Sequence, residues 1–129
     1  MPPIYELTRI EPAHIDRLDH QGIFTTGLLL EVSETPTRRQ YLADQVGADT
    51  TDVLMWRDEA LMLNLAGFAS DEHQLMIQAD IEGLHDILEL DLDAFEDRVD
   101  RAAAELGVDP PSRGTLSGWW EQAKTLEEE

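Results

Sequence analysis

The sequence predicts an all-α fold, built from two tandem repeats of about 60 residues that pack into one compact helical domain. Three observations favour this fold: apolar residues recur at spacings of three and four, helix-starting and helix-ending residues flank those segments, and the second half of the chain repeats the first. Alternation with period two is confined to short segments such as ELDLDAF, residues 89–95, at a helix junction.

The repeat is visible as matched residues at a slowly growing spacing. Ile23 matches Ile81 at 58 residues, and Gly47 matches Gly107 at 60 residues. At a spacing of 63 residues the matches are Val53 with Leu116, Trp56 with Trp119 and Ala60 with Ala123. We therefore divide the single predicted domain, residues 1-129, into pseudo-repeats 5-62 and 63-126. The acidic tail, 127-129, is expected to fray because carboxylates oppose the dipole at a helix C-terminus.

The first two helices of the chain are predicted from proline and from capping residues. Pro12 can open a helix whose apolar side is supplied by Ile15, Leu18 and Ile23. Thr35 is a typical N-cap and is followed by Pro36 in the first turn. Gly47 is a typical C-terminal residue for the helix that Pro36 begins.

The remaining helices are predicted in the same way. Asp49 is expected to cap a helix with an apolar face formed by Val53, Trp56, Ala60 and Leu63. Asp93 and Glu96 have the spacing of a capping box, and Gly107 ends the helix that follows them. Ser112 or a neighbour begins the last helix, which carries Leu116, Trp119, Trp120 and Ala123.

Charge is the outlying property of the composition. Twenty-eight acids against nine bases give a formal net charge of −19, which repels phosphate and anionic lipid. Such a surface is typical of adaptation to a salty cytoplasm (halophilic adaptation), or it serves to attract a basic partner. The absence of cysteine excludes disulfides and thiolate chemistry, and the N-terminal MPPIYELTRI does not have the pattern of a signal peptide. We expect a soluble, cytoplasmic protein with no membrane association.

Two short segments have the form of hairpins between helices: Arg9-Ile10-Glu11 and Gly67-Phe68-Ala69. Together with Trp56 and Trp119 in the helices between hairpins, they make residues 5–125 resemble the tandem helix-hairpin-helix family catalogued as domain of unknown function 4332. The pattern of that family is a Gly-apolar-Gly hairpin. The resemblance implies a fold and a nucleic-acid-binding ancestry, but no activity.

The hairpins depart from the family pattern at the glycines. A hairpin that binds phosphate needs glycine so that its backbone N–H groups can approach the ligand. Arg9 and Glu11 stand at both glycine positions of the first hairpin, and Ala69 stands at one position of the second. Asp71 and Glu72 then follow in the first turn of the next helix. These departures indicate degenerate hairpins that serve as packing elements.

We therefore expect a non-enzymatic, acidic helical interaction module that binds a protein partner, which the charge suggests is basic, or a second copy of itself. Trp120 has no match in the first repeat and is a candidate partner contact. The alternative is a nucleic-acid-binding helix-hairpin-helix module that works through Arg38, Arg39, Arg57 and Gly67. A third hypothesis is an acidic protein that mimics DNA.

Sequence motifs for catalysis, metals and cofactors were not found. The four histidines, His14, His20, His73 and His85, do not have the spacing of a metal site. The segment GTLSG, residues 114–118, has its serine fourth rather than third, so it is not a nucleophile elbow. We predict no catalytic residues, no metal site and no cofactor.

Overall fold

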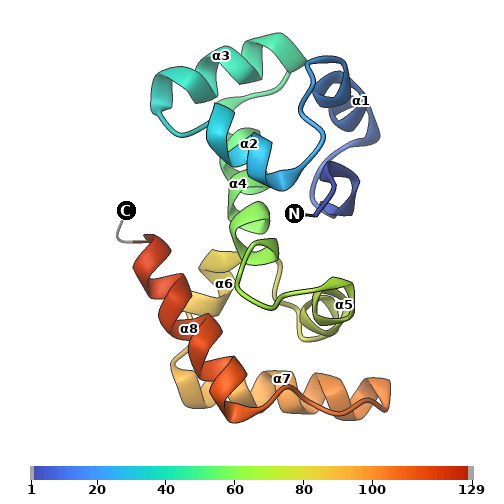
Figure 1. The fold of residues 1–129 in the computed structure, drawn as a ribbon, viewed down its shortest axis with the longest axis vertical. Helices are drawn as coiled ribbons and strands as arrows, with labels where there is room; N and C mark the ends of the chain where they lie inside the picture. The colour runs from blue at the N-terminus through green and yellow to red at the C-terminus, as the bar shows by residue number, and fades with distance from the viewer. Residues whose placement is uncertain (1, 128–129) are drawn as a thin grey trace. The chain divides into compact units, whose positions relative to one another are not determined.

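The computed structural model describes residues 2–127, and within them it contains eight α-helices and one short 3-10 turn (Figure 1). The elements are η1 (Ile4–Glu6), α1 (Pro12–His20), α2 (Thr26–Val32), α3 (Pro36–Val46), α4 (Thr50–Leu63), α5 (Ser70–Gln78), α6 (Leu84–Leu88), α7 (Leu92–Leu106) and α8 (Arg113–Glu127). The predicted all-α fold is confirmed for this part of the chain. Of the predicted frayed tail, 127-129, only Glu127 is described, and it ends α8.

The helices of residues 2–127 are all too short or too polar to cross a lipid bilayer.

The chain divides into two compact units, Met1–Asn64 and Leu65–Glu129, each with four α-helices among its described residues. In the first unit α1 packs on α3, and both α2 and α3 pack on α4. In the second unit α5 packs on α7, and both α6 and α7 pack on α8. Three helix pairings thus recur in the two units, whereas α2 also packs on α3 in the first unit. The boundaries of the pseudo-repeats, 5-62 and 63-126, stay a prediction.

Capping residues begin and end the helices of the first unit largely as their sequence predicts. The Thr35 side chain accepts a hydrogen bond from the Arg38 N–H at 3.1 Å, and Pro36 occupies the first turn of α3. Gly47 ends α3 in the left-handed conformation, with φ +69°. Asp49 and Asp52 form a capping box at the start of α4. These local signals fix where α3 and α4 begin.

The capping box predicted at Asp93 and Glu96 is wrong. Helix α7 begins one residue before Asp93, because the side chain of Asp91 accepts a hydrogen bond from the Ala94 N–H at 2.8 Å and caps the helix. Glu96 is bound instead by Arg113, at 2.9 Å between its Oε2 and the guanidinium Nη1. A long-range ion pair therefore uses the carboxylate that the local pattern assigned to the cap.

Each unit buries one tryptophan in its core. Trp56 of α4 and Trp119 of α8 are almost fully enclosed, as predicted from their apolar helical faces. The His14 ring packs on Trp56 at 5.2 Å between centroids, and the Phe68 ring packs on Trp119 at 5.3 Å. In the first unit a ring from α1 thus packs on the tryptophan of the last helix, and in the second unit the ring comes from the segment before α5.

We expect opposite effects from alanine at Gly107 and at Gly118, because only their backbone conformations differ. Neither glycine would bring a β-carbon within 4 Å of another group, but Gly107 has φ +69° whereas Gly118 lies inside α8. Gly118→Ala should raise the free energy of unfolding by about 0.5–1 kcal/mol, and Gly107→Ala should lower it by about 1 kcal/mol. Urea denaturation of both variants measures the difference. Equal shifts in the two variants would contradict the assigned conformations.

Candidate functional site

The first hairpin, residues 7–11 between η1 and α1, is bound by a carboxylate from the same unit. Glu59 of α4 is fully buried, and its Oε1 accepts hydrogen bonds from the Thr8 N–H at 2.8 Å and the Arg9 N–H at 3.1 Å. Its Oε2 accepts from the Thr8 hydroxyl. Backbone N–H groups of this kind are what a hairpin offers to a phosphate. Here they are bound to the carboxylate of Glu59.

The side chain of Arg9 is also used within the first unit. Its Nη1 lies 3.3 Å from Asp58 Oδ2, and both side chains are about three-quarters buried. An anion that approached this hairpin would therefore meet Asp58 and Glu59, two adjacent carboxylates of α4. Because like charges repel more strongly where water is partly excluded, this environment disfavours phosphate.

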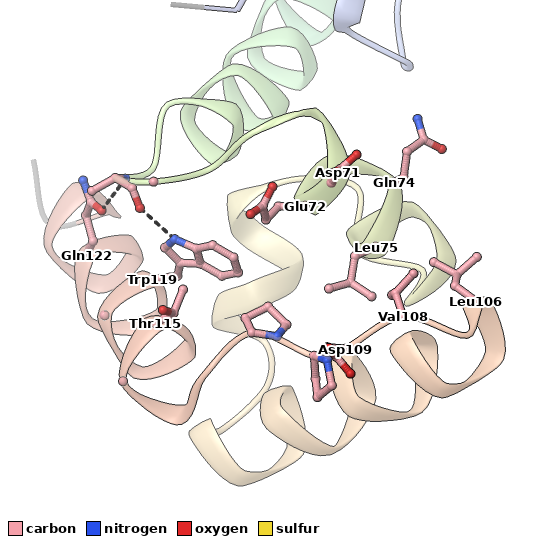
Figure 2. A pocket seen from close by; sticks show the side chains of 16 residues that line it. Asp71, Glu72, Gln74, Leu75, Leu106, Val108, Asp109, Thr115, Trp119 and Gln122 are labelled. Atoms are coloured by element: carbon pink, nitrogen blue, oxygen red, sulfur yellow. Dashed lines mark hydrogen bonds between the residues drawn. The ribbon is translucent and has the colours of Figure 1, made fainter.

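The second hairpin is a tight turn, Leu65–Phe68, in which the Phe68 N–H bonds to the Leu65 carbonyl at 3.0 Å. Gly67 is its third residue and has φ +76°, a conformation that glycine adopts readily. The Ala66 N–H donates to Gln122 Oε1 of α8 at 3.1 Å, and the Ala66 carbonyl accepts from the Trp119 indole N–H at 2.9 Å. Figure 2 shows both bonds as dashed lines. The last helix of the unit thus holds the hairpin.

Glu59 and Gln122 have equivalent roles in the two units, because each accepts a hydrogen bond from a backbone N–H group of a hairpin. They are 63 residues apart, which is the spacing of the two buried tryptophans. Each lies three residues after its tryptophan, on the last helix of its unit, and accepts an N–H from the hairpin that precedes the first helix. In each unit, a side chain of the last helix therefore accepts a hydrogen bond from the segment that precedes the first helix.

Acidic side chains follow the second hairpin directly. Helix α5 begins at Ser70 and has Asp71 and Glu72 in its first turn, where carboxylates favour the helix dipole. The sequence contains no lysine or arginine from residue 58 to residue 97. The second hairpin therefore lacks a cation nearby in the sequence that would attract phosphate.

The three arginines of the nucleic-acid hypothesis lie together, at the C-terminal end of α2. Arg57 Nη1 donates to the Leu30 carbonyl at 2.9 Å and to the Ser33 hydroxyl at 2.7 Å. Arg39 Nε donates to the Ser33 carbonyl at 2.9 Å, and Arg38 Nη1 donates to the Glu31 carbonyl at 3.2 Å. Carbonyls at a helix C-terminus lack intrahelical donors and carry a partial negative charge. The cluster therefore caps α2.

Burial lowers the pKa of the Arg57 guanidinium, and the nearby charge of Arg39 lowers it further, whereas Glu34 partly opposes the change. The charged form of Arg57 is thus less favourable in the folded unit than in water. Its hydrogen bonds to Leu30 and Ser33 compensate for this cost.

Trp120, the predicted partner contact, is half-buried and makes contacts within the second unit. Its indole N–H donates to the Leu90 carbonyl at 3.0 Å, and the Lys124 ammonium lies 4.5 Å from the ring centroid. Part of the residue stays exposed. The structure thus shows a packing role for Trp120, and its role in a partner contact stays a prediction.

Glu59, Gln122 and the groups that they bind were not among the site residues predicted from the sequence. The spacing of 63 residues that relates the tryptophans also relates Glu59 to Gln122, so this signal was present. Glu59 is also an acid three residues from Trp56 on an apolar helical face, which is an unusual place for a carboxylate. Among residues 2–127, no group of three metal-binding side chains is found.

In a comparison with protein families, the model of the family described as Domain of unknown function (DUF4332) matches residues 8–126. Comparisons with curated proteins and with solved structures gave no match.

Proposed function

The chain belongs to the DUF4332 family, whose description gives no activity, and we propose that it is a non-enzymatic interaction module that binds a protein partner. One observation carries the proposal: side chains of the chain itself occupy hairpin N–H groups in both units. A buried carboxylate, Glu59, does this in the first unit, where an inherited phosphate site would need an empty, cationic pocket. The hairpins then stabilise the fold, and a partner would bind elsewhere on the exposed surface.

The charge of the chain favours a basic partner over a second copy. With a net charge of −19, two copies repel each other, whereas a basic protein is attracted and steered. The same acids would also keep the surface hydrated in high salt. Self-association and salt adaptation therefore remain the alternatives to a basic partner.

A nucleic-acid-binding module is the second candidate, and the gathering of Arg38, Arg39 and Arg57 at one end of α2 is the observation that favours it. Against it, each of these guanidinium groups donates to a carbonyl near the end of α2. Affinity for duplex DNA depends on cations that are free to neutralise phosphates. An acidic DNA mimic is a third candidate, supported by charge alone.

Fluorescence anisotropy of labelled duplex and single-stranded oligonucleotides tests the proposal. We expect no binding at physiological salt by protein up to about 100 µM, the weak end of non-specific DNA affinities. Circular dichroism on the same samples verifies that the chain is folded. Micromolar binding that weakens steeply with salt would overturn the proposal in favour of the arginine cluster.

A matched pair of charge reversals tests the hairpin itself. Asp71→Lys places a cation in the first turn after the second hairpin, and Asp97→Lys makes the same change in charge on the exposed side of α7. If the hairpin is a packing element, the two variants should bind oligonucleotides equally weakly. Duplex binding by Asp71→Lys alone would mean that the second hairpin still has a phosphate site, which the carboxylate of Asp71 blocks in the wild-type chain.

A further inference from the structure

The second unit contains a cavity of about 860 Å³ between α5, the segment that joins α7 to α8, and α8 (Figure 2). One side is apolar, with Leu75 from α5, Leu106 from the end of α7 and Val108 from the segment that follows α7. Leu106 is 44% exposed and Val108 is 52% exposed, so water covers much of this apolar side. Along α8 the wall is formed by small residues, including Gly114 and Gly118, which keep the cavity open. Its volume is in the range of ligand-binding pockets.

The other side of the cavity is acidic. Asp71, Glu72 and Asp109 line it, and its lining contains no lysine or arginine. In Figure 2, Glu72 extends from α5 into the space between α5 and α8. Its Oε2 is buried and has no hydrogen-bond partner. A buried carboxylate oxygen without a donor is costly, and a cation that entered the cavity would remove that cost.

The first unit shows what fills the corresponding place. Arg17 of α1 donates from Nη1 to the Val46 carbonyl at the end of α3, at 2.9 Å. It lies so close to Gly47 that a β-carbon there would be 2.5 Å from the same nitrogen. The exposed side chain of Arg17 thus places a guanidinium at the C-terminal end of α3.

The position that corresponds to Arg17 in the second unit is Leu75. Both lie five residues before a residue of positive φ that follows the helix, Gly22 with φ 80° in one unit and Asp80 with φ 61° in the other. The third helices end alike, because Gly47 and Gly107 have the same left-handed conformation. Leucine has no donor, so the second unit has no counterpart of the Arg17 guanidinium at the end of α7.

We propose that this cavity binds an arginine side chain of a partner protein, together with the apolar residues that flank it. The guanidinium would pair with Glu72, and its neighbours would cover Leu106 and Val108. Arginine fits better than lysine, because its planar, weakly hydrated group forms paired hydrogen bonds with a carboxylate beside apolar walls. This inference rests on the proposed function and names the chemistry of the partner.

The test is a titration of the ¹⁵N-labelled full chain with the peptide acetyl-ALRLA-amide, followed by two-dimensional NMR at physiological salt. We expect shifts confined to the cavity, including the amides of Gly67, Gly114 and Gly118. The same peptide with citrulline in place of arginine, which keeps the shape and removes the charge, should bind about tenfold more weakly. Equal binding of the two peptides would overturn the proposal.

Three variants locate the binding. Glu72→Gln should weaken the arginine peptide about tenfold, because it removes the charge that pairs with the guanidinium. Asp97→Asn removes the same charge from the exposed side of α7 and should change the affinity little. Gly118→Leu fills the cavity from α8, where a β-carbon meets open space, and should abolish binding while the fold is retained.

Equal weakening by Glu72→Gln and Asp97→Asn would mean non-specific attraction and would overturn the cavity. An absence of shifts with the arginine peptide would also overturn the proposal that the cavity binds arginine. Neither result would test whether the hairpins bind nucleic acid. Failure of the proposed function is seen elsewhere, as oligonucleotide binding by the wild-type chain.

Discussion

Replacing Glu59 with alanine is expected to lower the free energy of unfolding by about 3 kcal/mol, the largest single effect that we predict. The change removes the acceptor of two backbone N–H groups and one hydroxyl, which belong to Thr8 and Arg9. Each donor that is left unsatisfied costs about 1–3 kcal/mol when buried, and water that enters the partly buried hairpin offsets some of that cost. Urea denaturation measures the loss. Hydrogen exchange should also show reduced protection of the Thr8 and Arg9 amides.

Gln122→Ala is the matched control, because Gln122 Oε1 accepts one hydrogen bond from the second hairpin, donated by the Ala66 N–H. A neutral acceptor of a single N–H should contribute about 1 kcal/mol. Glu59→Gln should lie between the two alanine variants, since it retains one acceptor oxygen and loses the charge. If Glu59→Ala cost no more than Gln122→Ala, the carboxylate would not be what orders the first hairpin.

Much of the fold could be predicted from the sequence, because helix limits depend on neighbouring residues. Thr35 with Pro36, and Asp49 with Asp52, begin helices through contacts that span a single turn. The local pattern failed at α7, where Asp91 and Asp93 both had the chemistry of a cap. Asp91 prevailed, and Glu96 was bound by Arg113, a residue 17 positions away in sequence. The spacing of neighbouring residues cannot show which of two aspartates caps a helix, because the ion pair between Glu96 and Arg113 of α8 depends on the fold.

The candidate sites were harder to predict because their partners lie far apart in the sequence. Thr8 and Glu59 are 51 residues apart, and Ala66 and Gln122 are 56 apart. Periodicity places Glu59 near the buried face of α4, but only the fold shows which N–H groups it meets there. The three arginines lie near one another in the structure, and their contact with nucleic acid stays a prediction. Their donation to the end of α2, however, depends on how α2 and α4 pack.

The two units also differ in a way that matching residues alone did not reveal. The first unit supplies its own guanidinium, Arg17, to the end of α3. The second has Leu75 at the corresponding place, with a cavity and an unpaired oxygen of Glu72 beside it. The first unit thus has a guanidinium at the end of its third helix, where the second unit has a cavity with a buried carboxylate oxygen. This difference is why we place the partner on the second unit.

Replacing Arg57 with methionine is expected to lower the free energy of unfolding by about 2 kcal/mol. Methionine keeps most of the apolar stem of the side chain, so the loss reports on the guanidinium. That group donates to the Leu30 carbonyl and to the hydroxyl of Ser33, a fully buried residue. Burial and Arg39 lower the pKa of Arg57, so its charge is unfavourable in the folded state. Removing the charge removes this unfavourable contribution. The net decrease in the free energy of unfolding should therefore be smaller than that for Glu59→Ala. Urea denaturation of the variant gives the value.

Arg38→Met is the matched control for Arg57→Met. Arg38 is exposed and makes one long hydrogen bond, 3.2 Å, to the Glu31 carbonyl, so its loss should cost no more than about 0.5 kcal/mol. The folded pKa of Arg57 lies below its unfolded value, so its charge opposes folding at every pH where the group is protonated. Arginine stays protonated near neutral pH, so the difference between wild type and Arg57→Met should be the same at pH 6 and pH 8. If the two variants were equally mild, the arginines would not be caps of α2 but free surface cations, which is what the nucleic-acid hypothesis requires.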